Sequence, residues 1–283
     1  WTLWLFTLSD LKTIVVPSTV FGIVNAYTAR GANEYHKSFH TLRLRILPVC
    51  FWVWLTLLPF TINNQQNPSS IAEDRVNKPW RPLPSKRISP TGAKQLMVLL
   101  YLLSLSLSAF TGLGLRQAIA LFFLGAWYNN FGGGDHSPLV RNAINACGYV
   151  CFASGALEVA LGQPIFFDSS MRAWLGMICG IILTTVHSQD MYDQQGDALR
   201  GRRTIPLVLG DLPARYTIAV WMFLWGIACP TFWHADLVVS AVSVSSALVV
   251  AIRTLRLRTV RSDKVTFMIW NVWIAGMFAM PLL

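Results

Sequence analysis

The sequence contains little charge for its length. Asp, Glu, Lys and Arg make up 13% of the 283 residues, hydrophobic residues make up 54%, and the mean hydropathy is +0.47. An ordinary soluble domain has about 25% charged residues. The shortage of charge therefore excludes a typical soluble protein and predicts a chain embedded in a membrane.

Acidic residues and cysteines are both scarce. The 13 Asp and Glu face 23 Lys and Arg, which leaves a formal net charge of +10. The bases lie between apolar stretches, which indicates membrane orientation and an anionic substrate rather than a nucleic-acid partner. The 5 cysteines have no neighbouring His or third Cys that would complete a zinc pattern, so we expect reduced thiols.

Long hydrophobic runs, by contrast, are abundant. A run of about 20 apolar residues can cross a bilayer as a helix. The sequence predicts an all-α integral membrane protein with one domain over residues 1–283 and no obligate protein partner. We expect nine transmembrane helices, at residues 13–30, 43–63, 93–112, 117–132, 139–160, 172–189, 213–232, 236–254 and 265–283.

The loops between these spans differ in their basic residues. If the spans alternate in direction, most Lys and Arg fall in the loops after the second, fourth, sixth and eighth spans. Loops rich in Lys and Arg stay in the cytoplasm. We therefore expect this face to be cytoplasmic in a multi-pass protein of the endoplasmic reticulum, surrounded by membrane lipid.

The few acids are concentrated, and one group follows the sixth predicted span. On a helix, Asp190, Asp193 and Asp197 would share one side, since residues three and four apart are neighbours. Three carboxylates on one side repel one another, so we expect a divalent cation or a row of bases against them. The alternative is a solvated helix end with a chance run of charges.

A second polar cluster lies in the loop predicted after the second span, on the same face. It contains the carboxamides 63–67, the acids Glu73 and Asp74, and bases that include Lys78 and Arg81. Oxygen ligands that share hard cations, with bases for the remaining phosphate charge, are what a magnesium–diphosphate site needs. A phosphate alone would not need the acids, and a metal alone would not need so many bases.

Both clusters resemble motifs of the UbiA-type intramembrane prenyltransferase superfamily. The residues that carry this resemblance are Asp74-Arg75-Val76-Asn77-Lys78-Pro79-Trp80-Arg81-Pro82, Asp190-x-x-Asp193-x-x-x-Asp197 and Gly201-Arg202-Arg203-Thr204. The resemblance implies helices around a central cavity, with two Asp-rich motifs that bind Mg²⁺ and a prenyl diphosphate. The usual first motif has ligands four and eight residues before Asp74, where this chain has Ser70 and Gln66. That departure resembles the fungal terpene cyclase branch and leaves open which carboxamide binds metal.

The resemblance implies a terpene cyclase that ionises farnesyl diphosphate, or geranylgeranyl diphosphate, and closes the resulting cation on itself. The alternatives are a prenyltransferase with an aromatic acceptor and, in a different class, a transporter or lipid-binding protein that uses the acids for ion coupling. The expected metal ligands are Asn64, Glu73, Asp74, Asp190, Asp193 and Asp197. The expected diphosphate ligands are Lys78, Arg81, Arg141, Arg202 and Arg203.

Aromatic rings beside these polar groups can stabilise a moving positive charge. We expect this role for Trp127, Phe131 and Tyr192, and we expect Tyr128 to be catalytic together with Asp74, Asp190 and Asp193. Packing between helices is the alternative role of the rings, and contact with lipid headgroups is the alternative role of the bases.

Overall fold

Every element of the described chain is a helix. The structure is a computed structural model that describes residues 1–29, 35–166 and 168–282, and side chains are described from residue 43 onward after the first gap. Helices suit a membrane because each backbone N–H and C=O is satisfied within its own segment. The chain divides into two compact units, Trp1–Gly132 with Val150–Phe166 and Gly133–Tyr149 with Phe167–Leu283.

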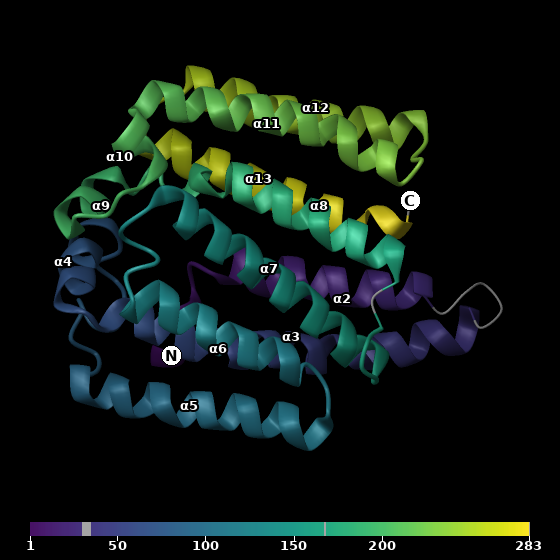
Figure 1. The fold of residues 1–283 in the computed structure, drawn as a ribbon, viewed down its shortest axis with the longest axis horizontal. Helices are drawn as coiled ribbons and strands as arrows, with labels where there is room; N and C mark the ends of the chain where they lie inside the picture. Colours follow the sequence, from purple (N-terminus) through teal and green to yellow (C-terminus); the bar gives the residue numbers. More distant parts are fainter. Residues whose placement is uncertain (30–34, 167, 283) are drawn as a thin grey trace. The chain divides into compact units, whose positions relative to one another are not determined.

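The first unit is built around the long helix α3, which contacts α1, α2, α4, α5 and α6 (Figure 1). Its elements are α1 (Thr2–Thr7), η1 (Leu11–Val15), α2 (Val16–Ala29), α3 (Tyr35–Gln66), α4 (Pro68–Asn77), α5 (Pro90–Thr111) and α6 (Leu115–Asn130). Helix α7 (Pro138–Leu161) contributes its second half to this unit and its first half to the other. Small residues allow close packing here: a Cβ on Gly22 of α2 would lie 2.7 Å from the Ala156 carbonyl of α7.

The second unit contains four long helices, among which α11 and α12 run side by side (Figure 1). Its elements are α8 (Ser169–Thr185), η3 (Val186–Gln189), α9 (Gln194–Arg200), α10 (Ile205–Leu209), α11 (Asp211–Phe232), α12 (Leu237–Arg256), α13 (Val260–Ala279) and η4 (Met280–Leu282). A Cβ on Gly226 of α11 would lie 2.8 Å from the Ala247 Cβ of α12, so these two helices approach closely. Ser243 strengthens the contact by donating to the Gly226 carbonyl at 2.9 Å.

The described residues contain 7 helices that are long and apolar enough to cross a membrane. They are Arg43–Gln66, Pro90–Thr111, Pro138–Leu161, Ser169–Gln189, Asp211–Phe232, Leu237–Arg256 and Val260–Leu282. These match seven predicted spans, so the protein is an integral membrane protein with several crossings.

The count of nine spans is not confirmed. The predicted span 13–30 is divided between the π-helical turn η1 and the 14-residue α2, and the predicted span 117–132 is the 16-residue α6. A helix of that second length extends about 24 Å, which is less than the hydrocarbon core of about 30 Å.

The two acidic segments fold differently from the prediction. The expected polar loop after the second span forms α4, with Pro68 in its first turn. The prediction that Asp190, Asp193 and Asp197 lie on one helix is wrong: after η3, residues 190–193 form a turn, and α9 begins at Gln194. The hydroxyls of Thr184 and Thr185 donate to carbonyls one turn back, a pattern that bends helices near their ends.

Candidate functional site

The first acidic motif is folded onto a buried arginine. Helix α4 carries Asp74, and the turn after it returns Arg81, whose Nη1 donates to both carboxylate oxygens of Asp74 at 2.9 and 3.1 Å. Both side chains are almost completely covered, with 8% and 2% of their surfaces exposed. Burial raises the pKa of Asp74, whereas Arg81 and the half-buried Lys78 oppose that rise. Glu73, beside Asp74, is also buried.

The carboxamides at the end of α3 join helices within the first unit. Asn63 donates to Asn130 Oδ1 of α6 at 2.9 Å, and Gln65 donates to the Phe6 carbonyl of α1 at 3.1 Å. Gln65 Oε1 is buried and has no hydrogen-bond partner among the described residues. Asn64, the predicted metal ligand, is half-buried at the same helix end. Two oxygens of this run, one on Asn64 and one on Gln65, are therefore candidates for a hard cation.

The second acidic motif begins with a buried aspartate that faces Arg141. The Arg141 Nη2 donates to Asp190 Oδ1 at 2.8 Å, and the two side chains expose 6% and 2% of their surfaces. The other oxygen, Asp190 Oδ2, is buried without a hydrogen-bond partner in the described part of the chain. Asp193 follows in the same turn and is also buried.

Asp135 is a residue of this site that sequence reasoning missed. Its carboxylate accepts hydrogen bonds from Arg202 Nε at 3.0 Å and from Arg200 Nη2 at 3.1 Å, and its carbonyl accepts from the Arg203 backbone N–H at 2.8 Å. Arg202 also donates through Nη1 to Asp197 Oδ1 at 3.2 Å. Burial would raise the pKa of Asp135, but the two arginines hold it below its usual value, so the carboxylate stays ionised near neutral pH.

One arrangement therefore occurs three times, a buried aspartate of a predicted metal site bonded to a buried arginine of the predicted diphosphate site. The pairs are Asp74 with Arg81, Asp190 with Arg141, and Asp197 with Arg202. Each arginine offsets part of the cost of burying its carboxylate, which would be far higher for an unpaired charge. Three of the five predicted diphosphate ligands, Arg81, Arg141 and Arg202, therefore lie beside predicted metal ligands.

The oxygens available at both motifs suit a hard divalent cation. Carboxylate and carboxamide oxygens are the ligands that Mg²⁺ prefers, and Asp190 Oδ2 and Gln65 Oε1 are buried oxygens without a hydrogen-bond donor among the described residues. In the same residues, no three His, Cys, Asp or Glu side chains are grouped so that they could hold a metal ion. Neither motif alone therefore supplies three carboxylates to one ion.

The predicted aromatic residues lie in different environments. Tyr128 is buried and meets Phe60 edge to face, with ring centroids 5.7 Å apart. Trp127 and Phe131 are 47% and 76% exposed. Tyr192 packs against Phe267 with 5.7 Å between the ring centroids, and the Lys264 ammonium lies 5.9 Å from the Tyr192 centroid. Of the predicted diphosphate ligands, Arg203 has an exposed side chain.

Comparison with known proteins identifies the family. Residues 45–273 match the model of the UbiA prenyltransferase family. The chain belongs to this family. The resemblance predicted from the two acidic motifs is therefore confirmed.

Other UbiA proteins resemble this one over most of its length. Fumagillin beta-trans-bergamotene synthase af520 of Aspergillus fumigatus is 31% identical over 281 residues, which cover 99% of this chain and 91% of the relative. Polyprenyl transferase eriF of Hericium erinaceus is 26% identical over 223 residues, which cover 75% and 70%. A solved UbiA homolog from Archaeoglobus fulgidus, bound to GPP and Mg²⁺, shares the fold with a TM-score of 0.66 and 16% identity over 100% of both chains.

Proposed function

We propose that this UbiA protein is a membrane-embedded terpene cyclase that ionises farnesyl diphosphate with Mg²⁺ and closes the resulting cation on itself. The observation that carries the proposal is the set of three buried aspartate–arginine pairs on the two motifs. The cyclase reading is supported by likeness to a beta-trans-bergamotene synthase along 99% of the chain. It is further supported by a departure from the usual first motif, which has metal ligands where this chain has Ser70 and Gln66. That departure resembles the fungal terpene cyclase branch.

The arginines provide a way to exchange one anion for another. Before substrate binds, Arg81, Arg141 and Arg202 neutralise the aspartates beside them. A diphosphate offers the same bidentate oxygens that a guanidinium prefers, so each arginine can turn to phosphate oxygens once its aspartate takes a metal. A bound Mg²⁺ would supply Lewis-acid stabilisation of the departing diphosphate. Its proposed ligands are Asn64, Glu73, Asp74, Asp190, Asp193 and Asp197.

In the proposed reaction, the bond between the allylic carbon and the diphosphate oxygen breaks, and the diphosphate leaves with the electron pair. A double bond of the same chain then attacks the cation and forms the ring bond, and loss of a proton gives the cyclic hydrocarbon. Tyr128 is the most buried of the four predicted aromatic residues, with 4% of its surface exposed. Such a ring can stabilise a passing cation by about 0.5–2 kcal/mol. The exposed Trp127 and Phe131 are less enclosed.

The alternative within the family is transfer of the prenyl group to a second molecule, which is favoured by the likeness to polyprenyl transferase eriF. The acceptor that we expect for such a transfer is aromatic. The two reactions share the ionisation step and differ only in which nucleophile meets the cation. We further propose that the acidic motifs face the cytoplasm from the endoplasmic reticulum membrane, because the bases flank them in the sequence.

The deciding experiment gives purified protein only a prenyl diphosphate and Mg²⁺. We expect release of diphosphate and a cyclic hydrocarbon by gas chromatography, with farnesyl diphosphate turned over faster than geranylgeranyl diphosphate and with no turnover in EDTA. Turnover that appears only after an aromatic acceptor is added would establish the transferase instead. No diphosphate release from either substrate would exclude both reactions.

A further inference from the structure

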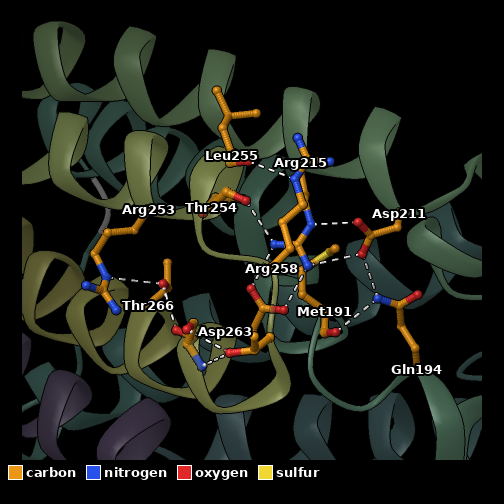
Figure 2. A network of polar contacts seen from close by, with 12 residues as sticks. Met191, Gln194, Asp211, Arg215, Arg253, Thr254, Leu255, Arg258, Asp263 and Thr266 are labelled. Carbon is orange, nitrogen blue, oxygen red and sulfur yellow. Dashed lines mark hydrogen bonds and ion pairs between the residues drawn. The ribbon is translucent and has the colours of Figure 1, made fainter.

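A buried arginine joins the ends of three helices next to the second acidic motif (Figure 2). Arg215 of α11 is fully covered and donates to both oxygens of Asp263 on α13, each at 2.8 Å. It also donates to both oxygens of Asp211, at 2.8 and 3.1 Å, and to the Thr254 carbonyl of α12 at 2.8 Å. These bonds use the whole guanidinium fork. The Asp211 side chain is 40% exposed, but its two bonds from the buried Arg215 fix the position of its carboxylate.

Gln194 connects this core to the turn that carries Asp190 and Asp193. Its Nε2 donates to Asp211 Oδ1 and to the Met191 carbonyl, each at 3.0 Å (Figure 2). Met191 lies inside the turn, and Gln194 is the first residue of α9. A single carboxamide thus closes the turn across its own backbone and fastens it to the start of α11.

The turn has little backbone support of its own. Its hydrogen bond from the Asp193 N–H to the Asp190 carbonyl is long, at 3.3 Å. Two other contacts hold the residues before it: His187 Nε2 lies 3.0 Å from Thr217 Oγ1, and Trp270 donates to Thr185 at 3.1 Å. Within the segment itself, Arg141 bonds to the Asp190 carboxylate and Tyr192 packs on Phe267. Gln194 adds a bond to the backbone of the turn, at the Met191 carbonyl.

We propose that Gln194 is a positioning residue, which holds Asp190 and Asp193 in the geometry they need to act on the diphosphate, with Asp211 and Arg215 as its support. The role in turnover rests on the proposed function, whereas the restraint on the turn stands on the contacts above. Misplacing a reacting group by about 1 Å can cost roughly 100-fold in rate. Partners that orient metal ligands contribute roughly 10- to 100-fold in metal affinity or activity.

The test compares Gln194→Leu with Gln195→Leu. Both changes remove a carboxamide of the same size, but Gln195 is exposed. In metal-free protein, we expect amide hydrogen exchange across residues 190–200 to become roughly 10-fold faster in Gln194→Leu only, because opening of the turn no longer breaks two hydrogen bonds. In the assay with farnesyl diphosphate, we expect its half-saturating Mg²⁺ concentration to rise roughly 10- to 100-fold.

A purely structural role predicts another result. The proposal would be overturned if Gln194→Leu lowered both the melting temperature and the activity while the half-saturating Mg²⁺ concentration stayed unchanged. Unchanged exchange across residues 190–200 would also overturn it. Gln194→Glu keeps the shape but places an acceptor against Asp211 and the Met191 carbonyl, so it must behave like Gln194→Leu; wild-type behaviour of this variant contradicts the proposal.

The exchange measurement needs neither metal nor substrate. If the wild-type protein releases no diphosphate, the proposed function fails, yet the exchange rates of the two variants still decide whether Gln194 restrains the turn. If the wild-type protein is active and exchange is unchanged, the positioning role fails alone.

Discussion

At the residue scale, the site depends on aspartates that are neutralised by arginines. Asp190 and Arg141 are both almost fully covered and bonded at 2.8 Å. Removing one member of a buried ion pair typically costs about 3–5 kcal/mol, because the other charge is left without a partner. Alanine at Asp190 would therefore mix a loss of chemistry with a loss of stability. Asparagine keeps an oxygen that can accept from Arg141 while removing the negative charge.

We predict that Asp190→Asn lowers the rate of diphosphate release about 100-fold or more, because the departing charge loses part of its stabilisation. The measurement is diphosphate release at saturating substrate, with elution from a sizing column to confirm folding. Asp236→Asn is the control: Asp236 is exposed and caps α12 by accepting from the Val239 N–H at 2.8 Å, which asparagine can also do. More than a few per cent of wild-type activity in Asp190→Asn would remove Asp190 from the metal ligands.

At the scale of the elements, one tryptophan holds several helices of the first unit together. Trp52 of α3 donates to Ser108 of α5 at 3.0 Å. Its ring also lies against two glycines, since a Cβ would come within 2.5 Å of it at Gly114 and within 2.1 Å at Gly155. Without a large hydrophobic effect between helices in lipid, such close packing supplies much of the attraction between them.

We expect Gly155→Ala to destabilise the protein by about 1–3 kcal/mol, because the added methyl group must displace the Trp52 ring. Thermal unfolding in detergent, followed by tryptophan fluorescence, measures this. Gly148→Ala is matched to it, since Gly148 lies on the same helix and its Cβ would meet nothing within 4 Å. Any gain in helix propensity, about 1 kcal/mol, is common to both changes. Equal melting temperatures for the two variants would show that the Trp52 contact contributes nothing.

At the scale of the whole molecule, the two acidic motifs belong to different units. The Asp74–Arg81 pair lies in the first unit, and the pairs of Asp190 and Asp197 lie in the second. In the described residues, neither motif groups three His, Cys, Asp or Glu side chains that could hold a metal ion. The proposed reaction therefore requires the two units to present their motifs to one diphosphate.

We predict that spin labels beside the two motifs lie closer together than the hydrocarbon core is thick, about 30 Å. The labels are placed through Arg75→Cys on α4 and Gln195→Cys on α9, both exposed, after replacement of the native cysteines. Pulsed electron resonance should give a single distance distribution between the labels, and its width should decrease when Mg²⁺ and inorganic diphosphate are added.

The control pair for this measurement combines Arg75→Cys with His234→Cys. Asp211, at the start of α11, lies beside the second motif, whereas His234 follows the other end of this helix. The 22 residues of α11 extend about 33 Å. We expect this second distance to be clearly longer. If the two distances were equal, or if the first exceeded the hydrocarbon thickness of about 30 Å, the motifs could not share a substrate.

The sequence by itself determined what depends on local properties. A run of apolar residues must satisfy its own backbone hydrogen bonds in lipid, so seven spans could be placed from composition alone. The two acidic motifs, with the Asn, Pro, Gly and basic residues that follow them, resemble those of the UbiA family, and the family match confirms that resemblance. Composition did not predict helix length. The predicted span 117–132 is apolar enough to cross a membrane, yet the helix there, Leu115–Asn130, has only 16 residues.

Only the tertiary structure decided which charges meet. Asp190 pairs with Arg141, 49 residues away in the sequence, and Asp135 pairs with Arg202 at a separation of 67 residues. No local pattern encodes such a pairing, since it depends on how distant helices pack. The same is true of the turn at residues 190–193. Gln194 attaches this turn to Asp211, and Asp211 is itself bonded to the buried Arg215. Hydrogen bonds between distant segments exist only once those segments have been brought together.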